Sequence, residues 1–345
     1  MTKIRVLHVA GQLEIGCSEK TLQIFCKYLD KSRFEVFACG RLRGGVRVKE
    51  LEGLGIPVFV RPPDFNTLVQ ELKIDICHVH RSGHYEPGSL PEKQGGWPRI
   101  VETNVFNYFD PVENELIDYH LFVSEFSRNR YAHQHGEDSQ FWYGVLYNPV
   151  DFEEFSGVAK TFTHTIGRCS RPDDAKWHIV CVNCLPRVFR KVPQTRCLVQ
   201  GATDQVRARL ARLGVTERVD VWELSLQVRD FYREVDVFIH GARVGETFGC
   251  GIAEAMANRI PVVTLSTPGR KKANAQTELV EHNTTGFVCR FSWQYADAVI
   301  ELLKNHELRE RFAIRSYEKA RAQFDASMLT RKLERIYFDL MDSRS

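Results

Sequence analysis

The 345-residue chain lacks any apolar run that approaches the roughly 20 residues needed to cross a bilayer. It also lacks the basic segment, apolar stretch and cleavage site of a secretory signal. Its net charge is small, because 47 Lys and Arg against 44 Asp and Glu give +3. These absences argue against integral membrane, secreted and nucleic-acid-binding proteins. We expect a cytoplasmic protein with at most peripheral membrane contact.

Clustered cysteines are also missing, since the ten cysteines are scattered singly through apolar stretches. This distribution predicts reduced, buried thiols. Cys181 and Cys184 form the one CxxC motif, and no second Cys or His pair has metal-ligand spacing, so we expect both to pack in the core. The loop 11–16 lacks the GxGxxG pattern, which disfavours a nicotinamide dehydrogenase. These patterns give no sign of a zinc site or of a nicotinamide cofactor.

Short β-branched runs alternate with segments of helical periodicity in both halves of the chain. The expected strands are residues 4–10, 35–40, 58–60, 74–79, 99–102, 120–123, 143–147, 162–166, 196–200, 219–222, 237–240 and 260–264. Alternating strands and helices predict parallel pairing, because a crossover helix connects neighbouring parallel strands. The predicted fold class is α/β, with two doubly wound parallel sheets.

The periodicity is lost around residues 149–159, which indicates a domain boundary. We expect a first domain over residues 1–157 and a second over residues 158–325. The last amphipathic stretch, residues 326–345, needs an apolar surface to cover and is expected to pack on the first domain. Ligands of such sheets bind at the carboxyl ends of the strands.

The strongest motif lies between two expected strands, at residues 245–257, and contains Glu246 and Glu254 eight positions apart. Gly249 and Gly251 permit a tight turn whose exposed amides suit a phosphate. Glu254, about one turn inside the helix, can reach sugar hydroxyls. The alternative is that Glu246 caps the helix and Glu254 is solvated.

A second motif, Ile166-Gly167-Arg168, ends the first expected strand of the second domain, and Lys176 follows eight residues after Arg168. Arg offers a planar fork and Lys a point charge, so the two could clamp a diphosphate.

Together these segments resemble the retaining glycosyltransferases of the GT-B fold, specifically glycosyltransferase family 4, or glycosyl transferases group 1. The resemblance extends over nearly the whole chain. It includes the segment from Glu246 to Val263, Asn148–Asp151, Glu278–Val280 and Thr285–Phe287. The family fold has two Rossmann-like domains that face a central cleft, with a C-terminal helix that crosses back to the first domain.

The resemblance implies a retaining, metal-independent glycosyltransferase of the hexosyltransferase type, EC 2.4, which needs neither a metal ion nor a cofactor. Its donor would be a nucleotide-diphosphate sugar, with UDP or GDP as the expected nucleotide. Its acceptor would be a carbohydrate, a lipid-linked molecule or a small molecule, with no nucleic acid partner. The implied catalytic residues are Glu246, Arg168 and Lys176. The implied donor-binding residues are Gly16, Cys17, Arg168, Lys176, Glu246, Thr247, Phe248, Gly249 and Glu254.

The departures from the family pattern lie in the first domain. Cys17 replaces a glycine of the donor-phosphate loop, and Asn104 stands where many members carry a His. Asn cannot act as a general base. We take Asn104, His78 and His80 as acceptor-side candidates at the mouth of the cleft. His78 and His80 alternate along a strand and have no third ligand at metal spacing, so an acceptor-side or structural pair is favoured over a metal site.

Four aromatic residues of the first domain remain open between an acceptor platform and core packing: Trp97, Phe106, Tyr108 and Phe109. Two other functions also remain open. A GT-B sugar-nucleotide epimerase could use the same donor site, and a non-catalytic nucleotide-sugar-binding protein is suggested by Cys17 and Asn104.

Overall fold

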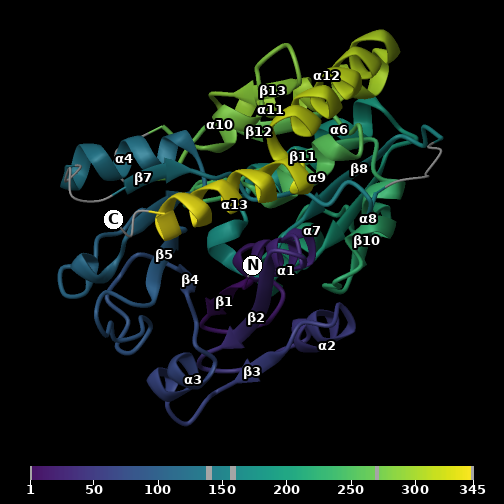
Figure 1. Cartoon of the computed structure of the whole chain (residues 1–345). Coiled ribbons are helices and arrows are strands. Elements are labelled where there is room, and N and C mark those ends of the chain that lie inside the picture. Colours follow the sequence, from purple (N-terminus) through teal and green to yellow (C-terminus); the bar gives the residue numbers. More distant parts are fainter. Residues whose placement is uncertain (1, 137–141, 156–160, 269–271, 343–345) are drawn as a thin grey trace. The chain divides into compact units, whose positions relative to one another are not determined.

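The computed structural model describes residues 2–136, 142–155, 161–268 and 272–342, which divide into two compact units (Figure 1). Unit 1 comprises residues 1–149 and 325–345, and unit 2 comprises residues 150–324. The boundary expected between residues 157 and 158 lies outside the described residues. Each unit contains one parallel sheet, which confirms the predicted α/β class.

Unit 1 is built on a seven-stranded sheet in the order β3-β2-β1-β4-β5-β6-β7. Its strands are β1 (Ile4–Ala10), β2 (Phe34–Gly40), β3 (Val58–Val60), β4 (Ile76–Arg81), β5 (Arg99–Asn104), β6 (Tyr119–Phe122) and β7 (Trp142–Val145). Its helices are α1 (Cys17–Tyr28), α2 (Arg47–Gly53), α3 (Phe65–Glu71), α4 (Glu125–His135) and α13 (Ala326–Asp342). The strand order reverses between β1 and β4, where doubly wound sheets open a crevice for ligands.

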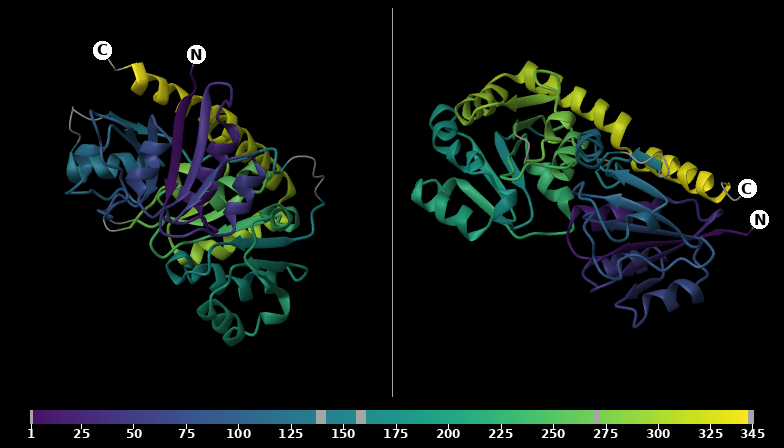
Figure 2. Two further views of the ribbon diagram at one scale, coloured as in Figure 1. Left: turned by 60° about the horizontal axis from the view of Figure 1, so that its bottom comes forward. Right: turned by 90° about the vertical axis from the view of Figure 1, so that its left-hand side faces the viewer.

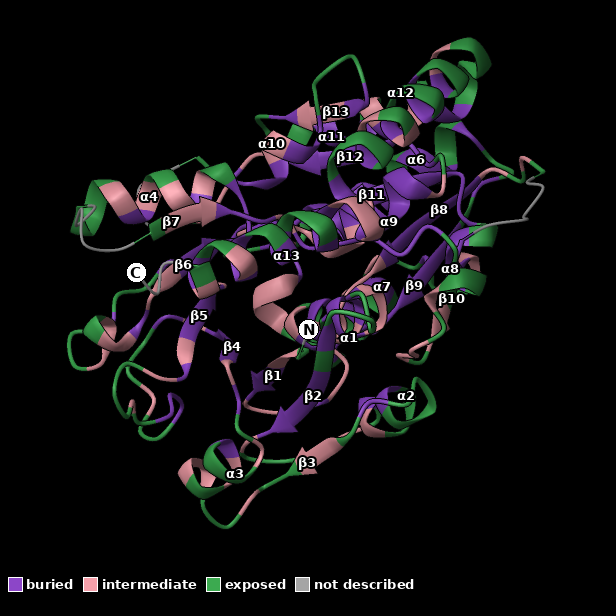
Figure 3. Ribbon diagram, in the orientation of Figure 1, coloured by how far each residue is buried: buried purple, intermediate pink, exposed green. Residues whose placement is uncertain are grey.

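The C-terminal helix α13 belongs to the core of unit 1, as predicted. Its apolar face, which includes Leu329, Leu333 and Tyr337, packs with Leu22 and Phe25 of α1 in one hydrophobic cluster. Figures 1 and 2 show α13 extending along unit 1. The inner strands of the sheet are mostly buried, while the edge strands β3 and β7 and the outer faces of the helices are partly exposed (Figure 3).

A buried hydrogen-bond chain joins α13 to β1 and β4. Tyr337 Oη lies 2.6 Å from His78 Nδ1 and 3.5 Å from His8 Nε2. His8 Nδ1 lies 3.2 Å from His80 Nε2, and His78 Nε2 lies 2.8 Å from Thr103 Oγ1. Every member is less than 5% exposed. These hydrogen bonds therefore join four segments, β1, β4, β5 and α13.

Unit 2 is built on a six-stranded sheet in the order β10-β9-β8-β11-β12-β13. Its strands are β8 (Thr165–Cys169), β9 (Arg196–Gln200), β10 (Val219–Trp222), β11 (Val237–His240), β12 (Val262–Leu265) and β13 (Gly286–Cys289). Its helices are α5 (Val180–Asn183), α6 (Leu185–Lys191), α7 (Asp204–Arg212), α8 (Val228–Glu234), α9 (Cys250–Ala257), α10 (Gln276–Leu279), α11 (Ser292–Lys304) and α12 (His306–Phe324).

The first strand of unit 2 lies three residues later in the chain than the sequence pattern predicts. Residues 162–164 stay outside the sheet, because the amide of Thr163 donates to Asp236 Oδ2 and His164 has a positive φ of 61°. Phe162 packs instead under the guanidinium of Arg309, 3.5 Å from its ring centroid. Arg168 consequently lies inside β8 rather than at its end.

The cysteines and the helices bear on the expectations of reduced thiols and of no membrane span. The cysteines are free thiols, and seven of the ten are buried, including Cys181 and Cys184, in agreement with a packing role; Cys17 is exposed, and Cys169 and Cys250 are partly exposed, which corrects the expectation for these three. Among the residues that the structure describes, no helix combines the length and the apolar character that a membrane span requires.

The buried histidines predict that unit 1 loses stability in mild acid. Burial lowers the pKa of His8, His78 and His80, that of His80 to about 3, and Lys31 lowers the pKa of His8 further. These side chains are neutral in the folded state, and below pH 6.5 they take up protons when the protein unfolds. Their contribution to the free energy of unfolding is therefore complete above pH 6.5 and is lost as the pH falls below it. Three such groups reduce the free energy of unfolding by about 4 kcal/mol between pH 7.5 and 5.5.

Hydrogen exchange of β1 and β4 amides in the full chain at these two pH values measures the loss. His80→Gln should reduce the difference by about a third, whereas His133→Gln, which changes an exposed side chain on α4, should leave it unchanged. Equal protection of β1 and β4 at both pH values would contradict this expectation.

Candidate functional site

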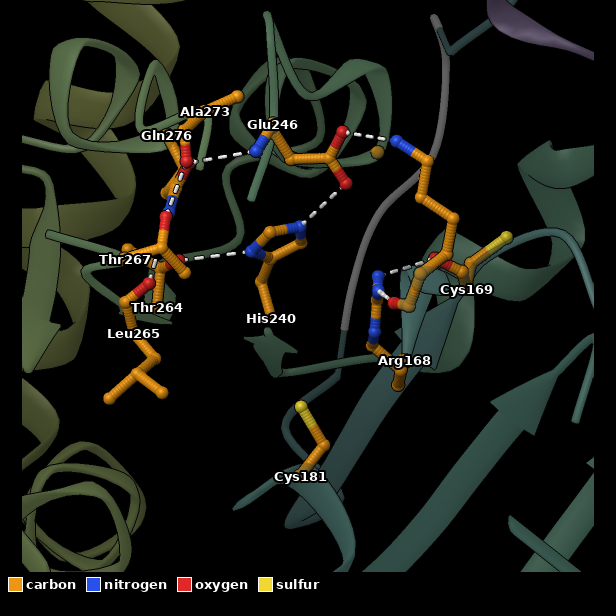
Figure 4. A network of polar contacts seen from close by, with 12 residues as sticks. Arg168, Cys169, Cys181, His240, Glu246, Thr264, Leu265, Thr267, Ala273 and Gln276 are labelled. Carbon is orange, nitrogen blue, oxygen red and sulfur yellow. Dashed lines mark hydrogen bonds and ion pairs between the residues drawn. The ribbon is translucent and has the colours of Figure 1, made fainter. Parts of the chain in front are cut away.

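A polar cluster occupies the carboxyl edge of the unit 2 sheet, in the loop between β11 and α9. Glu246 of this loop accepts a hydrogen bond from Lys176 Nζ at 2.8 Å, and its other oxygen lies 3.4 Å from His240 Nε2 (Figure 4). His240 is the last residue of β11, and Lys176 ends the short helical turn Asp174–Lys176 after β8. The two strand ends therefore bring the predicted residues Lys176 and Glu246 into direct contact.

The main chain of Glu246 is held from both sides. Its amide donates to Gln276 Oε1 at 3.1 Å, and its carbonyl accepts from the amide of Ala275 at 2.9 Å. Gln276 is fully buried, and its amide nitrogen donates to Leu265 O and Thr267 Oγ1 (Figure 4). Gly245 has a φ of 75°, and a Cβ there would lie 1.6 Å from Ala273 O. Glycine is thus required immediately before Glu246.

The charges of the cluster follow from its burial. Burial raises the pKa of Glu246, but the ammonium of Lys176 and the hydrogen bond from His240 outweigh it and hold that pKa well below its usual value. Burial and the nearby Arg168 lower the pKa of His240 to about 4. His240 is therefore neutral at pH 7. A carboxylate only accepts, so Nε2 carries the proton, and Nδ1 accepts from Thr264 Oγ1 at 3.0 Å.

Helix α9 begins beside this cluster. Gly249 is the N-cap of this helix, with a φ of 111°, and as a glycine it supplies no capping side chain. The exposed end of a helix dipole favours an anion. Glu254, one turn inside α9, is 8% exposed, and its Oε2 accepts from Tyr232 Oη at 2.9 Å. Neither the capping role for Glu246 nor the solvated position for Glu254 agrees with these contacts.

Arg168 differs from the sequence prediction of an open diphosphate clamp. It is 2% exposed, and its two terminal nitrogens donate to the carbonyl oxygens of Cys169 and Lys176, both at 2.8 Å. Trp177 covers the guanidinium, with its ring centroid 5.2 Å from Cζ. Because Arg168 lies within β8, it holds the main chain of Lys176 while the Lys176 ammonium reaches Glu246.

The other predicted donor residues are divided between the two units. Thr247 is partly exposed beside Glu246, whereas Phe248 is 2% exposed and packs edge-on against Phe324. In unit 1, Gly16 precedes α1 in an extended conformation, and Cys17 is exposed at the first turn. A side chain at Gly16 would meet the Glu19 carboxylate.

The acceptor-side candidates lie in the interior of unit 1 rather than at an open mouth, which corrects the sequence prediction. His78 and His80 are 0% and 4% exposed and belong to the hydrogen-bond chain with Tyr337. Asn104 is 1% exposed and donates to Tyr108 O at 2.8 Å and to Glu102 Oε2 at 3.3 Å. His78 and His80 alternate with Cys77 and Val79 along β4 and so share the face of Ile76, which packs in one hydrophobic cluster with α1 and α13.

Three of the four aromatic residues that the sequence left open are on the surface. Phe106, Tyr108 and Phe109 are 41%, 45% and 38% exposed in the loop after β5. Tyr108 stacks on His84, with ring centroids 3.9 Å apart. Phe106 and Tyr108 are therefore not core residues, and their side chains are open to a ligand.

Sequence reasoning missed three residues that organise these clusters. His240 is polar at the end of a buried strand, which is the one signal that could have indicated it. Gln276 and His8 carry no local signal, because their roles depend on contacts with residues 30 and 72 positions away. His8 also supplies the third imidazole near His78 and His80 that the spacing did not show.

Residues 163–305 match the family model described as glycosyl transferases group 1. A phosphatidyl-myo-inositol mannosyltransferase of Mycobacterium leprae is 28% identical over 185 residues, which is 52% of this chain and 47% of that protein. An N-acetyl-alpha-D-glucosaminyl L-malate synthase of Bacillus anthracis is 31% identical over 98 residues, or 28% of this chain and 24% of that protein. The chain thus spans about half or less of the length of these two relatives.

Solved structures agree with the fold of the whole chain. HepE of Anabaena, in complex with UDP and glucose, superposes with a TM-score of 0.75 at 18% identity and covers 97% of this chain and 100% of its own. A sucrose-phosphate synthase of Thermosynechococcus elongatus superposes with a TM-score of 0.72 at 13% identity, covering 99% and 100%.

The contact between Lys176 and Glu246 predicts energetic coupling between the two side chains. A double-mutant cycle with Lys176→Met and Glu246→Gln should give a coupling energy of about 1 to 3 kcal/mol in urea unfolding at pH 7. Salt should change it little, because the side chains are only 19% and 12% exposed. The control cycle is the exposed pair Arg187 and Asp297, whose coupling should stay below about 1 kcal/mol. Equal coupling in the two cycles would refute the prediction.

The family match begins before β8 and extends through α11, so it contains Lys176, Glu246 and Glu254 together with the strands that position them. The superpositions extend the likeness in fold over unit 1 as well. Most of unit 2 therefore matches the glycosyl transferases group 1 model, in a chain with the GT-B fold.

Proposed function

We propose that this protein transfers a sugar from a nucleotide-diphosphate sugar to an acceptor hydroxyl, with retention of anomeric configuration and without a metal ion. The observation that carries the proposal is the Lys176–Glu246–His240 cluster beside the start of α9. It combines a cation, a partly exposed carboxylate and the N-terminal end of a helix at one sheet edge. A sugar diphosphate needs such groups: positive charge for the phosphates and an acceptor for sugar hydroxyls.

In this proposal the bond between the anomeric carbon and the diphosphate oxygen breaks, and negative charge grows on the leaving diphosphate. The Lys176 ammonium and the first amides of α9 stabilise that charge, the role that Mg²⁺ fills in other sites. Glu246 accepts hydrogen bonds from the donor sugar, and neutral His240 keeps its carboxylate ionised and oriented. Arg168 acts as a positioning residue, because it holds the carbonyl of Lys176.

The nucleotide is proposed to lie toward Glu254, whose carboxylate would accept from the ribose hydroxyls while Tyr232 holds one of its oxygens. UDP is the first nucleotide to test, since HepE of Anabaena was solved with UDP and glucose. For the acceptor, the exposed aromatic residues Phe106 and Tyr108 are better candidates than the buried His78, His80 and Asn104. Aromatic faces pack against the apolar faces of sugar rings.

Sugar transfer can be tested with UDP- and GDP-sugars and a panel of carbohydrate, lipid-linked and small hydroxyl acceptors. The wild type should form a product with the anomeric configuration of the donor, in the presence of EDTA. Glu246→Gln and Lys176→Met should each reduce kcat/KM by about 100-fold, because each removes a charge next to the reacting diphosphate.

The matched controls are Glu217→Gln and Lys191→Met, which change exposed side chains of unit 2 outside the cluster and should leave kcat/KM unchanged. A donor whose sugar changes configuration without an acceptor would identify an epimerase instead. Donor binding without turnover across the whole panel would identify a non-catalytic binding protein, the function that Cys17 and Asn104 suggest in the sequence.

A further inference from the structure

Unit 2 contains a second concavity that shares no lining residue with the Lys176–Glu246–His240 cluster. Its volume is about 500 Å³, and it lies between the segment Asp174–Val182 and helix α7. Its apolar wall includes Trp177, Ile179, Val182 and Val206. Ile179 is 52% exposed, so this wall is open to a ligand. The volume lies in the range of about 300 to 1,000 Å³ that is typical of small-molecule sites.

The polar side of this pocket is strongly cationic. Arg209, Arg212 and Arg243 line it, and Asp174 is the single acidic residue among its lining residues. Arg209 Nε donates to Asn183 Oδ1 at 2.9 Å. Across the described ranges none of the three guanidinium groups forms an ion pair with a carboxylate. Three uncompensated guanidinium groups around one pocket create a positive potential that attracts an anion.

The titration of His178, which also lines the pocket, agrees with this potential. Burial lowers its pKa, and the positive charges of Lys272 and Arg243 lower it further. Its Nδ1 accepts a hydrogen bond from the amide of Val180, so His178 serves the local fold and leaves anion recognition to the arginines.

We propose that this pocket binds a small soluble phosphate ester, with the phosphate held by Arg212 and Arg243 and the apolar body against Ile179, Val182 and Val206. The planar guanidinium fork matches two phosphate oxygens, and the apolar wall adds affinity for an ester over inorganic phosphate. The concave shape and volume fit a small molecule rather than a polymer. The inference is independent of the donor site, because none of the proposed catalytic residues lines the pocket.

One structural link connects the pocket with the donor cluster. The amide of Arg243 donates to Ala175 O at 2.9 Å, and Lys176 follows Ala175 directly. A bound ester would therefore contact the same short segment that presents Lys176 to Glu246.

Calorimetric titration of the full chain with phenyl phosphate tests the proposal. The wild type should bind phenyl phosphate more tightly than inorganic phosphate, and benzyl alcohol, the neutral counterpart, should not bind. Arg212→Ala and Arg243→Ala should each weaken binding about tenfold, the usual loss for a hydrogen bond to a charged group. Arg190→Ala removes an exposed guanidinium from α6 in the same unit and should have no effect. Matching thermal unfolding of all variants verifies that each is folded.

Three results would overturn the proposal. Phenyl phosphate could bind equally well to the Arg212→Ala/Arg243→Ala double variant. It could be displaced by saturating UDP, which would place it at the Glu246 cluster. It could fail to bind while phosphatidylglycerol vesicles bind with the same arginine dependence, which would make this face a membrane surface. A failure of UDP to bind would count against the proposed transferase activity alone, since the arginine variants test the pocket separately.

Discussion

The ion pair of Lys176 with Glu246 is the interaction on which the candidate site depends. A carboxylate that is 12% exposed costs free energy unless it is paired and hydrogen-bonded. Lys176 and His240 supply this pairing from two neighbouring strand ends. The same constraint explains the surrounding structure: Arg168 fixes the main chain of Lys176, and Gln276 fixes that of Glu246. The site is thus preorganised by buried hydrogen bonds to the backbone rather than by loop packing alone.

The sequence predicts much of the architecture because parallel sheets leave a strong local pattern. Buried β-branched runs alternate with amphipathic helices, and these runs can be recognised without information from distant residues. Glu246 and Lys176 could also be predicted, because a glycine-bracketed acid and a cation after a strand are local signals. The error at β8 arose because Phe162 is apolar yet packs against Arg309, while Asp236 holds the neighbouring backbone out of the sheet.

What the sequence could not predict depends on contacts between distant segments. The sequence predicts Arg168 as a phosphate ligand. Because β8 begins three residues later than predicted, the guanidinium of Arg168 instead donates to carbonyl oxygens. The sequence predicts His78 and His80 as acceptor-side residues, but only the fold shows that they form hydrogen bonds with Tyr337 and His8 in the interior. The exposure of Phe106 and Tyr108 likewise follows from the loop after β5, not from their residue type. Residue identity gives the chemistry that a side chain can perform, whereas burial decides whether a substrate can reach it.

The proposed transfer requires that the carboxyl edge of the unit 2 sheet binds a nucleotide diphosphate without a metal ion. This binding can be measured by thermal unfolding of the full chain with UDP, GDP, ADP and dTDP in the presence of EDTA. A ligand at 100 times its Kd stabilises the folded state by about 2.7 kcal/mol. We expect one nucleotide to raise the Tm of the wild type, and Glu254→Gln to reduce this shift while Glu217→Gln does not. The absence of a shift with every nucleotide, or an equal shift in both variants, would contradict the proposal.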